Sequence, residues 1–223
     1  MKNKRGFTLI ELLVVMAIIA VLSSILFPVF ASAKRSAQDK VCQSNMKQLA
    51  LATALYTDTF GGNYPMQSQD AVVDWNSPTA ADNWAKALEK YIKSAHIPAC
   101  GISRTRSDCK TNCTMAVGSI SYPISYLGNG KIFGNRANES MVKHASKTIL
   151  FQCGGRTWNK CWLAPAFDAE YEEWNDYTSS SWCNHNEGTN LAFADSHIGW
   201  CRYKKLAENV ATNKEAKLTM FDL

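Results

Sequence analysis

The first part of the chain is almost continuously apolar. After a short basic segment at residues 1–6, the stretch 7–33 contains a single ionisable side chain, Glu11. About 20 apolar residues in a helix cross a bilayer, and this stretch of 27 residues exceeds that length. The pattern therefore predicts a transmembrane helix close to the N-terminus.

The next stretch, residues 34–60, changes from continuously apolar to amphipathic. Its apolar residues recur at steps of three and four, with Lys and Gln between them: Val41, Met46, Leu49, Leu51, Ala52 and Leu55. We therefore expect one unbroken helix over residues 7–60, roughly 80 Å long at about 1.5 Å per residue. Gly61, Gly62 and Pro65 are typical of the end of such a helix.

Beyond residue 60 the pattern predicts a mixed α and β head. Helical spacing predicts a short helix over 79–93, whereas 100–118 has no periodicity, so we interpret it as a loop held by disulfides. Short β-branched or aromatic runs predict four strands: 120–127, 148–153, 190–194 and 198–203. The last two flank Asp195-Ser196 and should form a hairpin. The expected fold class is α+β, with a long N-terminal α-helix packed on a small antiparallel β-sheet.

The length of 223 residues suits one anchor and one globular head. We expect four segments: a leader at 1–6, a transmembrane half-helix at 7–33, an amphipathic half-helix at 34–60 and a disulfide-containing head at 61–223. The net charge of +5 owes three of its charges to Lys2, Lys4 and Arg5. The remaining charge is too small and too scattered to indicate a nucleic-acid partner.

The cysteine content is high for a chain of this size. All eight lie beyond the apolar segment: Cys42, Cys100, Cys109, Cys113, Cys153, Cys161, Cys183 and Cys201. An even count suits disulfides in an oxidising compartment. A zinc site would need ligand pairs such as C-x2-C, and the closest pair here, Cys109 and Cys113, has three intervening residues. We therefore expect disulfides rather than a metal, with the pairing left open.

The charges around the apolar segment predict its orientation. The basic residues 1–6 should stay in the cytoplasm by the positive-inside rule, which places the head outside. A cleaved signal peptide has an apolar core of only about 7–15 residues, roughly half the length found here. A plain membrane anchor explains the length but not Glu11, because a carboxylate in hydrocarbon costs about 2.5–3.5 kcal/mol and requires a partner.

The sequence GFTLIELLVVMAIIAVLSSILFP, residues 6–28, resembles the N-terminal signature of type IV prepilins and type II secretion pseudopilins. The resemblance implies that a prepilin peptidase cuts between Gly6 and Phe7 and methylates the new amine. It also implies that Glu11 meets the N-terminal amine of a neighbouring subunit during assembly, which would give the acid its partner. Pro28 matches the helix-kinking proline of many family members.

A second stretch, residues 185–197, resembles a C-terminal motif in a large bacterial subfamily of pilin-like proteins. In that motif a His is followed, after nine residues, by Asp-Gly and then often by His. His185, Asp195 and His197 fit this spacing, whereas Ser196 replaces the usual glycine. Because a tight turn here requires positive φ, we expect strain at Ser196. Residues 42–49 also resemble this subfamily, in the segment just past the membrane.

Several polar residues raise the question of a bound ligand. His185, Asp195 and His197 are suitable metal ligands, but a metal would need a further ligand, and Asp at a β-turn is also ordinary turn chemistry. An acidic cluster could hold a structural Ca²⁺ ion, although a solvated loop explains it as well: Asp168, Glu170, Glu172, Glu173 and Asp176. No residues have the spacing of a catalytic, cofactor or metal motif, so we expect neither an enzyme nor a bound cofactor.

Two functions remain open from the sequence. The favoured one is a structural subunit of a type IV pilus-like filament or a type II secretion pseudopilus. Its partners would be the prepilin peptidase, other copies or related pilins, and the inner-membrane assembly machinery. Such a chain would cross the inner membrane once, with its N-terminus in the cytoplasm and its head outside, before it enters a filament. The alternative is a membrane-anchored exported protein with a ligand- or metal-binding head.

Overall fold

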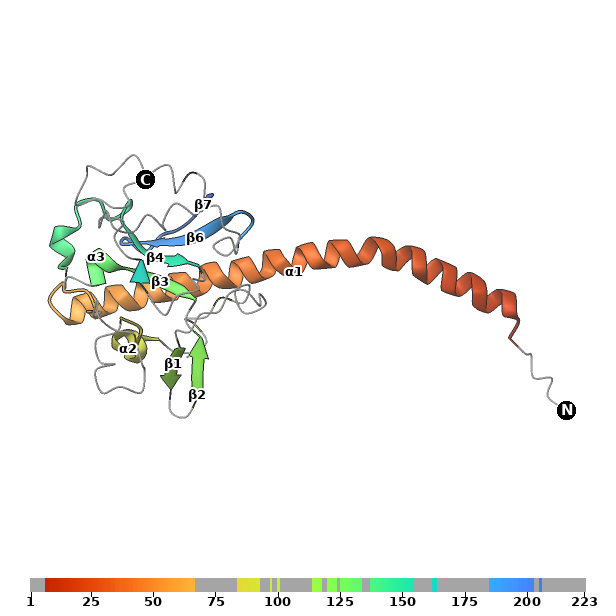
Figure 1. Ribbon diagram of the computed structural model, residues 1–223, viewed down its shortest axis with the longest axis horizontal. Helices are drawn as coiled ribbons and strands as arrows, with labels where there is room; N and C mark the ends of the chain where they lie inside the picture. Colours follow the sequence, from red (N-terminus) through yellow and green to blue (C-terminus); the bar gives the residue numbers. More distant parts are fainter. Residues whose placement is uncertain are drawn as a thin grey trace, which may run out of the picture. The chain divides into compact units, whose positions relative to one another are not determined.

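The computed structural model describes part of the chain (Figure 1). The described residues are 7–66, 84–92, 97, 100, 114–117, 120–123, 125–133, 137–154, 162–163, 185–202 and 205. The contacts divide the chain into two units, residues 1–38 and residues 39–223. One helix, α1 (Leu9–Thr59), runs across the boundary between these units.

Helix α1 confirms the predicted long N-terminal helix and continues through Pro28. It ends where the glycines predict, because the N–H of Gly62 donates to the carbonyl of Thr57 at 2.7 Å. Gly61 and Gly62 have φ values of 63° and 82°, which a residue without Cβ adopts at little cost. This bond, from the third residue after Thr59 back to a carbonyl five positions earlier, is the Schellman arrangement for closing a helix C-terminus.

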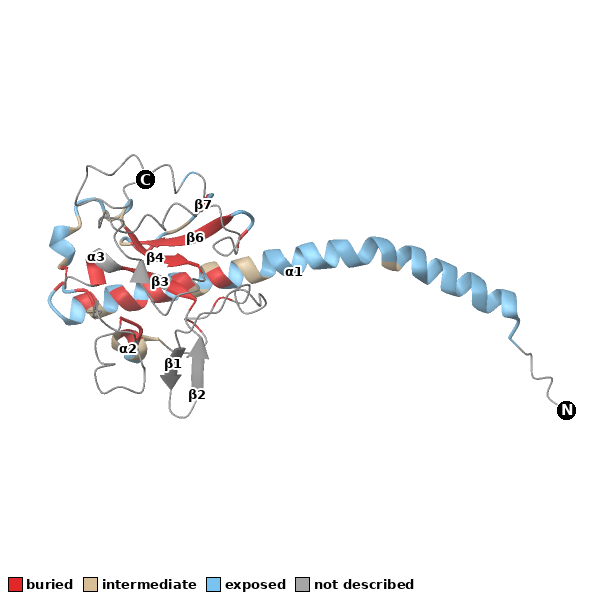
Figure 2. Cartoon of the chain, viewed as in Figure 1, coloured by how far each residue is buried: buried red, intermediate tan, exposed pale blue. Residues whose placement is uncertain are grey.

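The part of α1 that precedes residue 38 has almost no buried surface. Residues 9–37 are exposed except for the half-buried Ser23 (Figure 2). The helix is long and apolar enough to cross a membrane, and no residue of its most apolar window is buried. An apolar surface on all sides of a helix is typical of a segment that lies in lipid or packs among other apolar helices.

The later part of α1 has a buried face that belongs to the core of the head. Its members recur mostly at steps of three and four: Cys42, Met46, Leu49, Ala50, Ala52, Thr53 and Thr57. The predicted apolar stripe is therefore wrong in half of its residues, since Val41, Leu51 and Leu55 are 54%, 46% and 56% exposed. The buried face is centred on Cys42 and Met46, and these three apolar side chains point to another side of the helix.

Five strands of the head form one sheet, in the order β5-β3-β4-β6-β7 (Figure 1). Their bounds are β3 (Tyr126–Asn129), β4 (Ile149–Cys153), β5 (Trp162–Leu163), β6 (Gly188–Phe193) and β7 (Ile198–Arg202). Four strands pair in antiparallel fashion, as predicted, and β5 joins β3 in parallel at one edge. Strands β6 and β7 form the predicted hairpin around Asp195-Ser196.

Two predictions for the middle of the chain are wrong. The single strand expected over 120–127 is two strands, because β2 (Ile120–Pro123) pairs with β1 (Thr114–Val117) and β3 belongs to the larger sheet. Pro123 lacks an N–H for a ladder, which favours a strand end at that position. The loop expected over 100–118 contains β1, whose order comes from pairing with β2 rather than from a pattern of its own.

Short helices complete the described part of the head. They are α2 (Trp84–Leu88), the 3-10 helix η2 (Glu89–Tyr91), α3 (Gly130–Phe133) and the 3-10 helix η4 (Glu139–Met141). The first two fall within the predicted helix 79–93, of which residues 79–83 and 93 lie outside the described residues. The sequence pattern did not predict α3, η4 or β5.

The core of the head is built around three aromatic rings. The Phe151 ring lies 4.9 Å from that of Trp84 and 5.2 Å from that of Phe133, centre to centre. Gly128 on β3 leaves room for them, because a Cβ there would lie 2.8 Å from the Phe133 ring. Buried residues of α1, including Met46, belong to the same cluster. The core therefore holds this part of α1 against the sheet and brings α1 side chains close to strand ends.

Candidate functional site

The start of α1 is closed by two residues that bond to each other. The Glu11 carboxylate accepts hydrogen bonds from the Thr8 N–H at 2.8 Å and from the Thr8 hydroxyl at 2.6 Å. In return, the Glu11 N–H donates to the Thr8 hydroxyl oxygen at 3.4 Å. This reciprocal pattern is a capping box. Glu11 therefore has partners inside its own chain, in addition to the neighbouring amine that the resemblance implies.

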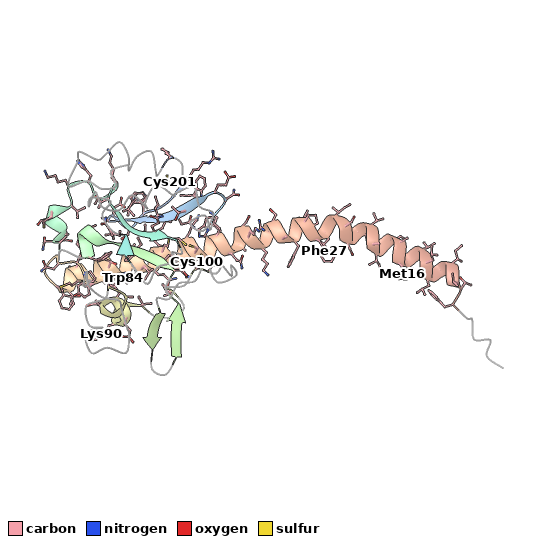
Figure 3. All side chains as sticks on the ribbon, in the orientation of Figure 1. Met16, Phe27, Trp84, Lys90, Cys100 and Cys201 are labelled. Atoms are coloured by element: carbon pink, nitrogen blue, oxygen red, sulfur yellow. The ribbon has the colours of Figure 1, made fainter. Side chains whose placement is uncertain are left out.

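The first part of α1 presents large apolar side chains to its surroundings. Met16 and Phe27 are 63% and 71% exposed, and Figure 3 shows them on this part of the helix. Phe7, on one side of the predicted cleavage site, is exposed, while Gly6 on the other side lies outside the described residues. Apolar surface gains about 25 cal/mol per Å² when it leaves water, so this segment favours lipid or contact with other helices.

The backbone of His185 is held by a tight turn that leads into β6. Asn186 and Glu187 have φ values of 55° and 62°, and His185 and Gly188 exchange backbone hydrogen bonds at 3.2 and 3.0 Å. Positive φ at both central residues is the pattern of a type I′ turn. The indole N–H of Trp200 on β7 also donates to the His185 carbonyl at 2.9 Å. The turn and the indole together fix the position of His185.

The side chain of His185 lies among three cysteines from distant parts of the chain. Its Nε2 is 3.5 Å from Sγ of Cys100 and 3.2 Å from Sγ of Cys153 at the end of β4. Cys42 on α1 completes the group, and the four ligand-type atoms all lie within 4.8 Å of one another. Each cysteine is 0% exposed and His185 is 3% exposed. We call these four residues the cysteine–histidine cluster.

The expectation of disulfides is not met by the four cysteines that the structure describes. Cys42, Cys100, Cys153 and Cys201 all have free thiols. Cys42, Cys100 and Cys153 lie together around the imidazole of His185 instead of forming disulfides. Cys201 lies apart from Cys100 (Figure 3). The remaining four cysteines lie outside the described residues: Cys109, Cys113, Cys161 and Cys183.

Close packing in the cysteine–histidine cluster shifts the proton affinities of its members. The pKa of Cys100 lies well below its ordinary value because the neighbouring thiols of Cys153 and Cys42 form hydrogen bonds with its sulfur. Burial raises the pKa of Cys153 well above its ordinary value. Burial alone would lower the pKa of His185, but contacts with Cys100 and Cys42 outweigh it and raise that pKa to about 10. The cluster by itself thus favours a thiolate beside an imidazolium.

A polar network surrounds the other ring nitrogen of His185. Its Nδ1 lies 2.6 Å from Oδ1 of Asp39 on α1, within ion-pair distance, although the ring is not aimed closely enough for a hydrogen bond. The Asp39 carboxylate accepts hydrogen bonds from the side-chain amides of Asn190 at 2.8 Å and Gln43 at 3.0 Å. Helix α1 and strand β6 therefore hold this carboxylate beside the imidazole.

Asp195 and His197 form a separate pair at the other end of β6. The His197 N–H donates to Oδ1 of Asp195 at 3.0 Å, and its ring Nδ1 lies 2.5 Å from the same oxygen. Ser196 between them has φ of 68°, which is the strained conformation predicted for this position. Lys47 donates to the Ser196 carbonyl at 2.6 Å. Because β6 has six residues and spans roughly 20 Å, the motif splits into a buried cluster around His185 and a turn in which Asp195 and His197 are exposed.

Comparison with known proteins places the N-terminal segment in a family. Residues 1–27 match the prokaryotic N-terminal methylation motif. The type IV wide pilus major component PilA4 of Thermus thermophilus is 41% identical over 56 residues. The N-terminal segment of the chain is therefore type IV pilin-like. The matched stretch makes up 25% of this chain and 43% of the relative, so the chain spans under half the length of that relative. No solved structure matches it.

The sequence patterns did not predict the cysteine–histidine cluster. Its members stand at positions 42, 100, 153 and 185, so no two of them have the spacing of a metal motif. A usable signal was present, since Cys42 and His185 each lie in one of the two segments that resemble the same pilin-like subfamily. The acidic residues considered for calcium, between 168 and 176, lie outside the described residues.

Proposed function

We propose that this pilin-like protein is a structural subunit of a type IV pilus-like filament or a type II secretion pseudopilus. The observation that carries the proposal is the exposed apolar part of α1, which coincides with the match to the N-terminal methylation motif. In the inner membrane lipid covers this surface, and in the filament the same surface packs against α1 of other subunits. The likeness to a pilin favours a structural role over an enzymatic one.

Processing at the N-terminus is the first step of this function. A prepilin peptidase removes residues 1–6 and methylates the new amine of Phe7, as the match over residues 1–27 suggests. Mass analysis of the N-terminus, on chains from membranes and from sheared filaments, tests this step. We expect the filament fraction to begin with methylated Phe7. A chain that keeps Met1 in every fraction would contradict the proposal.

Glu11 is proposed to attract the amine of Phe7 on a neighbouring subunit during assembly. The capping box offers a competing explanation, because Glu11 also accepts two hydrogen bonds from Thr8. Three variants separate the two roles. Glu11→Gln keeps an oxygen for the cap but removes the charge, Thr8→Val removes the hydroxyl but keeps the charge, and Glu11→Ala removes both.

The yield of sheared filament, measured against membrane-inserted chain, distinguishes these variants. If the charge drives assembly, Glu11→Gln and Glu11→Ala lower the yield at least tenfold while Thr8→Val stays near the wild-type level. If the cap alone matters, Glu11→Gln assembles normally and the proposed contact with the amine is wrong. All three variants should insert into the membrane at wild-type levels, because they leave the apolar segment intact.

The second candidate function is a membrane-anchored exported protein whose head binds a metal or another ligand. The cysteine–histidine cluster is the observation that favours it. This candidate predicts that the leader stays attached and that no filament contains the chain. The same mass analysis and filament preparation therefore decide between the two functions.

A further inference from the structure

We propose that the head binds one zinc ion through four buried side chains: Cys42, Cys100, Cys153 and His185. The ligand atoms would be the three Sγ atoms and Nε2 of the imidazole. These atoms already lie within 4.8 Å of one another. The site goes beyond the filament function, because it concerns how the head is held together.

The distances in the cluster fit a tetrahedral zinc site. With Zn–S near 2.3 Å and Zn–N near 2.0–2.1 Å, the edges of a tetrahedron are about 3.6 Å from sulfur to nitrogen and about 3.8 Å from sulfur to sulfur. The observed separations from Nε2 are 3.5 Å to Sγ of Cys100 and 3.2 Å to Sγ of Cys153. The full set of separations extends up to 4.8 Å, so side-chain movements of up to about an ångström would place the four atoms around one ion.

The chemistry of the ligands selects zinc and a structural role. Three thiolates and one imidazole form a Cys₃His set, which is one of the common structural zinc sets. Sulfur ligands disfavour the hard cations Ca²⁺ and Mg²⁺, which take oxygen. All four coordination positions would come from the protein, and the four side chains are 0–3% exposed. No position is left for a water or a substrate, so the site is closed rather than catalytic.

The surroundings of the cluster match what a bound metal requires. The Asp39 carboxylate lies 2.6 Å from Nδ1 of His185, and its negative charge favours a proton on Nδ1, which leaves Nε2 free for a metal even though the two groups are not aligned for a hydrogen bond. The Tyr126 hydroxyl donates to Sγ of Cys42 at 3.6 Å, a contact that stabilises a thiolate. The Thr189 hydroxyl bonds to the carbonyl of Cys153 and helps to fix that residue. These contacts come from α1, β3 and β6.

A disulfide within the cluster is the main competing explanation. It could join only two of the three cysteines, and it would leave the third thiol with the imidazole as its polar neighbour. Zinc uses all four side chains at once. The ion would also join α1, through Cys42, to β4, through Cys153, and to the turn before β6, through His185.

The metal content of the full-length chain, extracted in detergent, tests the proposal directly. We expect close to one zinc ion per chain by elemental mass spectrometry. Replacement of zinc by Co²⁺ should give the absorption bands of a tetrahedral cobalt thiolate site. This measurement does not depend on leader cleavage or on filament formation, so its result stands apart from the proposed function.

Variants with a matched control locate the site. Cys100→Ser and His185→Gln should each lose zinc, with affinity lowered at least tenfold. Cys201→Ser is the control, because Cys201 is also a buried free cysteine but lies outside the cluster. It should keep a full complement of zinc. Asp39→Asn should keep the ion but lower its affinity by about 10–100-fold, as loss of an outer partner does at other sites.

One further variant keeps the proposal testable if the others misfold. His185→Cys replaces the imidazole by a fourth thiolate, so it should bind zinc and give a cobalt spectrum shifted from that of the wild type. The proposal is overturned by a wild-type chain without zinc, by copper or iron in its place, or by a disulfide within the cluster. Equal loss of zinc in Cys201→Ser would overturn the assignment of the ligands.

Discussion

The two parts of α1 have the same secondary structure but opposite surroundings. The side chains of Met16 and Phe27 in the first part are mostly exposed, whereas Cys42, Met46 and Leu49 in the second have no exposed surface. Composition alone accounts for the first part, since a membrane or a bundle of equivalent helices accepts many apolar sequences. The second part depends on individual residues, because each meets a particular neighbour in the head.

Because of this difference, we expect mutations in the first part of α1 to leave the stability of the head unchanged, and mutations in the second part to change it. A spectroscopic reporter is available, because Trp75 is the first tryptophan in the chain and every other one follows it. Unfolding of the full-length chain in detergent, followed by tryptophan fluorescence, therefore measures the head alone. Far-ultraviolet circular dichroism includes the helix of the anchor as well.

The largest effect should come from removing the proposed zinc ion. A metal chelator should lower the free energy of unfolding of the head by several kcal/mol, since structural zinc supplies about 10–16 kcal/mol of apparent binding energy in small zinc domains. The fluorescence transition should move to lower denaturant or vanish, while the dichroism of the anchor persists. If chelation leaves the fluorescence transition unchanged, zinc does not support the head.

A cavity in the second part of α1 should have the next largest effect. Leu49→Ala removes a fully buried side chain and should destabilise the head by about 2–5 kcal/mol. Leu51→Ala, two residues later, changes a side chain that is 46% exposed and should change stability by less than about 1 kcal/mol. Leu13→Ala in the first part should have no effect on the fluorescence transition. Equal effects at Leu49 and Leu51 would contradict the burial described for α1.

Crowding beside His185 should have a smaller effect. A Cβ on Gly188 would lie 2.5 Å from the Cys201 carbonyl oxygen and 2.6 Å from the Trp200 ring. Gly188→Ala should therefore destabilise the head by about 1–3 kcal/mol and lower zinc occupancy, because it displaces the turn that holds His185. Gly199→Ala is the control, since its Cβ would meet only the Phe193 ring at 3.1 Å. If Gly188→Ala leaves both stability and zinc occupancy unchanged, the turn that holds His185 accommodates an added methyl group and this prediction is wrong.

The smallest effect should be a gain in stability at the hairpin turn between β6 and β7. Ser196 has φ of 68°, a conformation that costs a non-glycine residue about 1–2 kcal/mol. Ser196→Gly should raise the stability of the head by roughly 0.5–1 kcal/mol, after the entropy cost of glycine is subtracted. Ser146→Gly, at an exposed position without positive φ, should be neutral or destabilising. A loss of stability in Ser196→Gly would mean that the serine side chain matters more than the backbone.

The sequence predicted those features that depend on local pattern. The long helix followed from an apolar stretch continued by an amphipathic one, and its end at Gly61 and Gly62 from the freedom of glycine at positive φ. The hairpin of β6 and β7 followed from two β-rich runs around a turn, and the strain at Ser196 from the glycine it replaces. Each of these features is decided by residues close together in the chain.

The features that the sequence did not predict depend on contacts between distant residues. Leu51 and Leu55 are as apolar as Leu49, and only the packed sheet decides which side of α1 is covered. Strand β1 exists through its pairing with β2. The cysteine–histidine cluster is the extreme case, because its members have no spacing that a motif could describe. Tertiary structure, rather than local preference, brings them together.

The wide spacing of the four clustered side chains has a consequence for how the head is completed during export. If the head is exported as proposed, Cys42 would leave the membrane directly after the anchor, whereas His185 would follow only when most of the head has been synthesised. An ion that needs all four ligands can be captured only at that late stage. A chain that stops before residue 185 could enter the membrane by its N-terminus, but its head would lack the last ligand and could be told apart from a finished subunit.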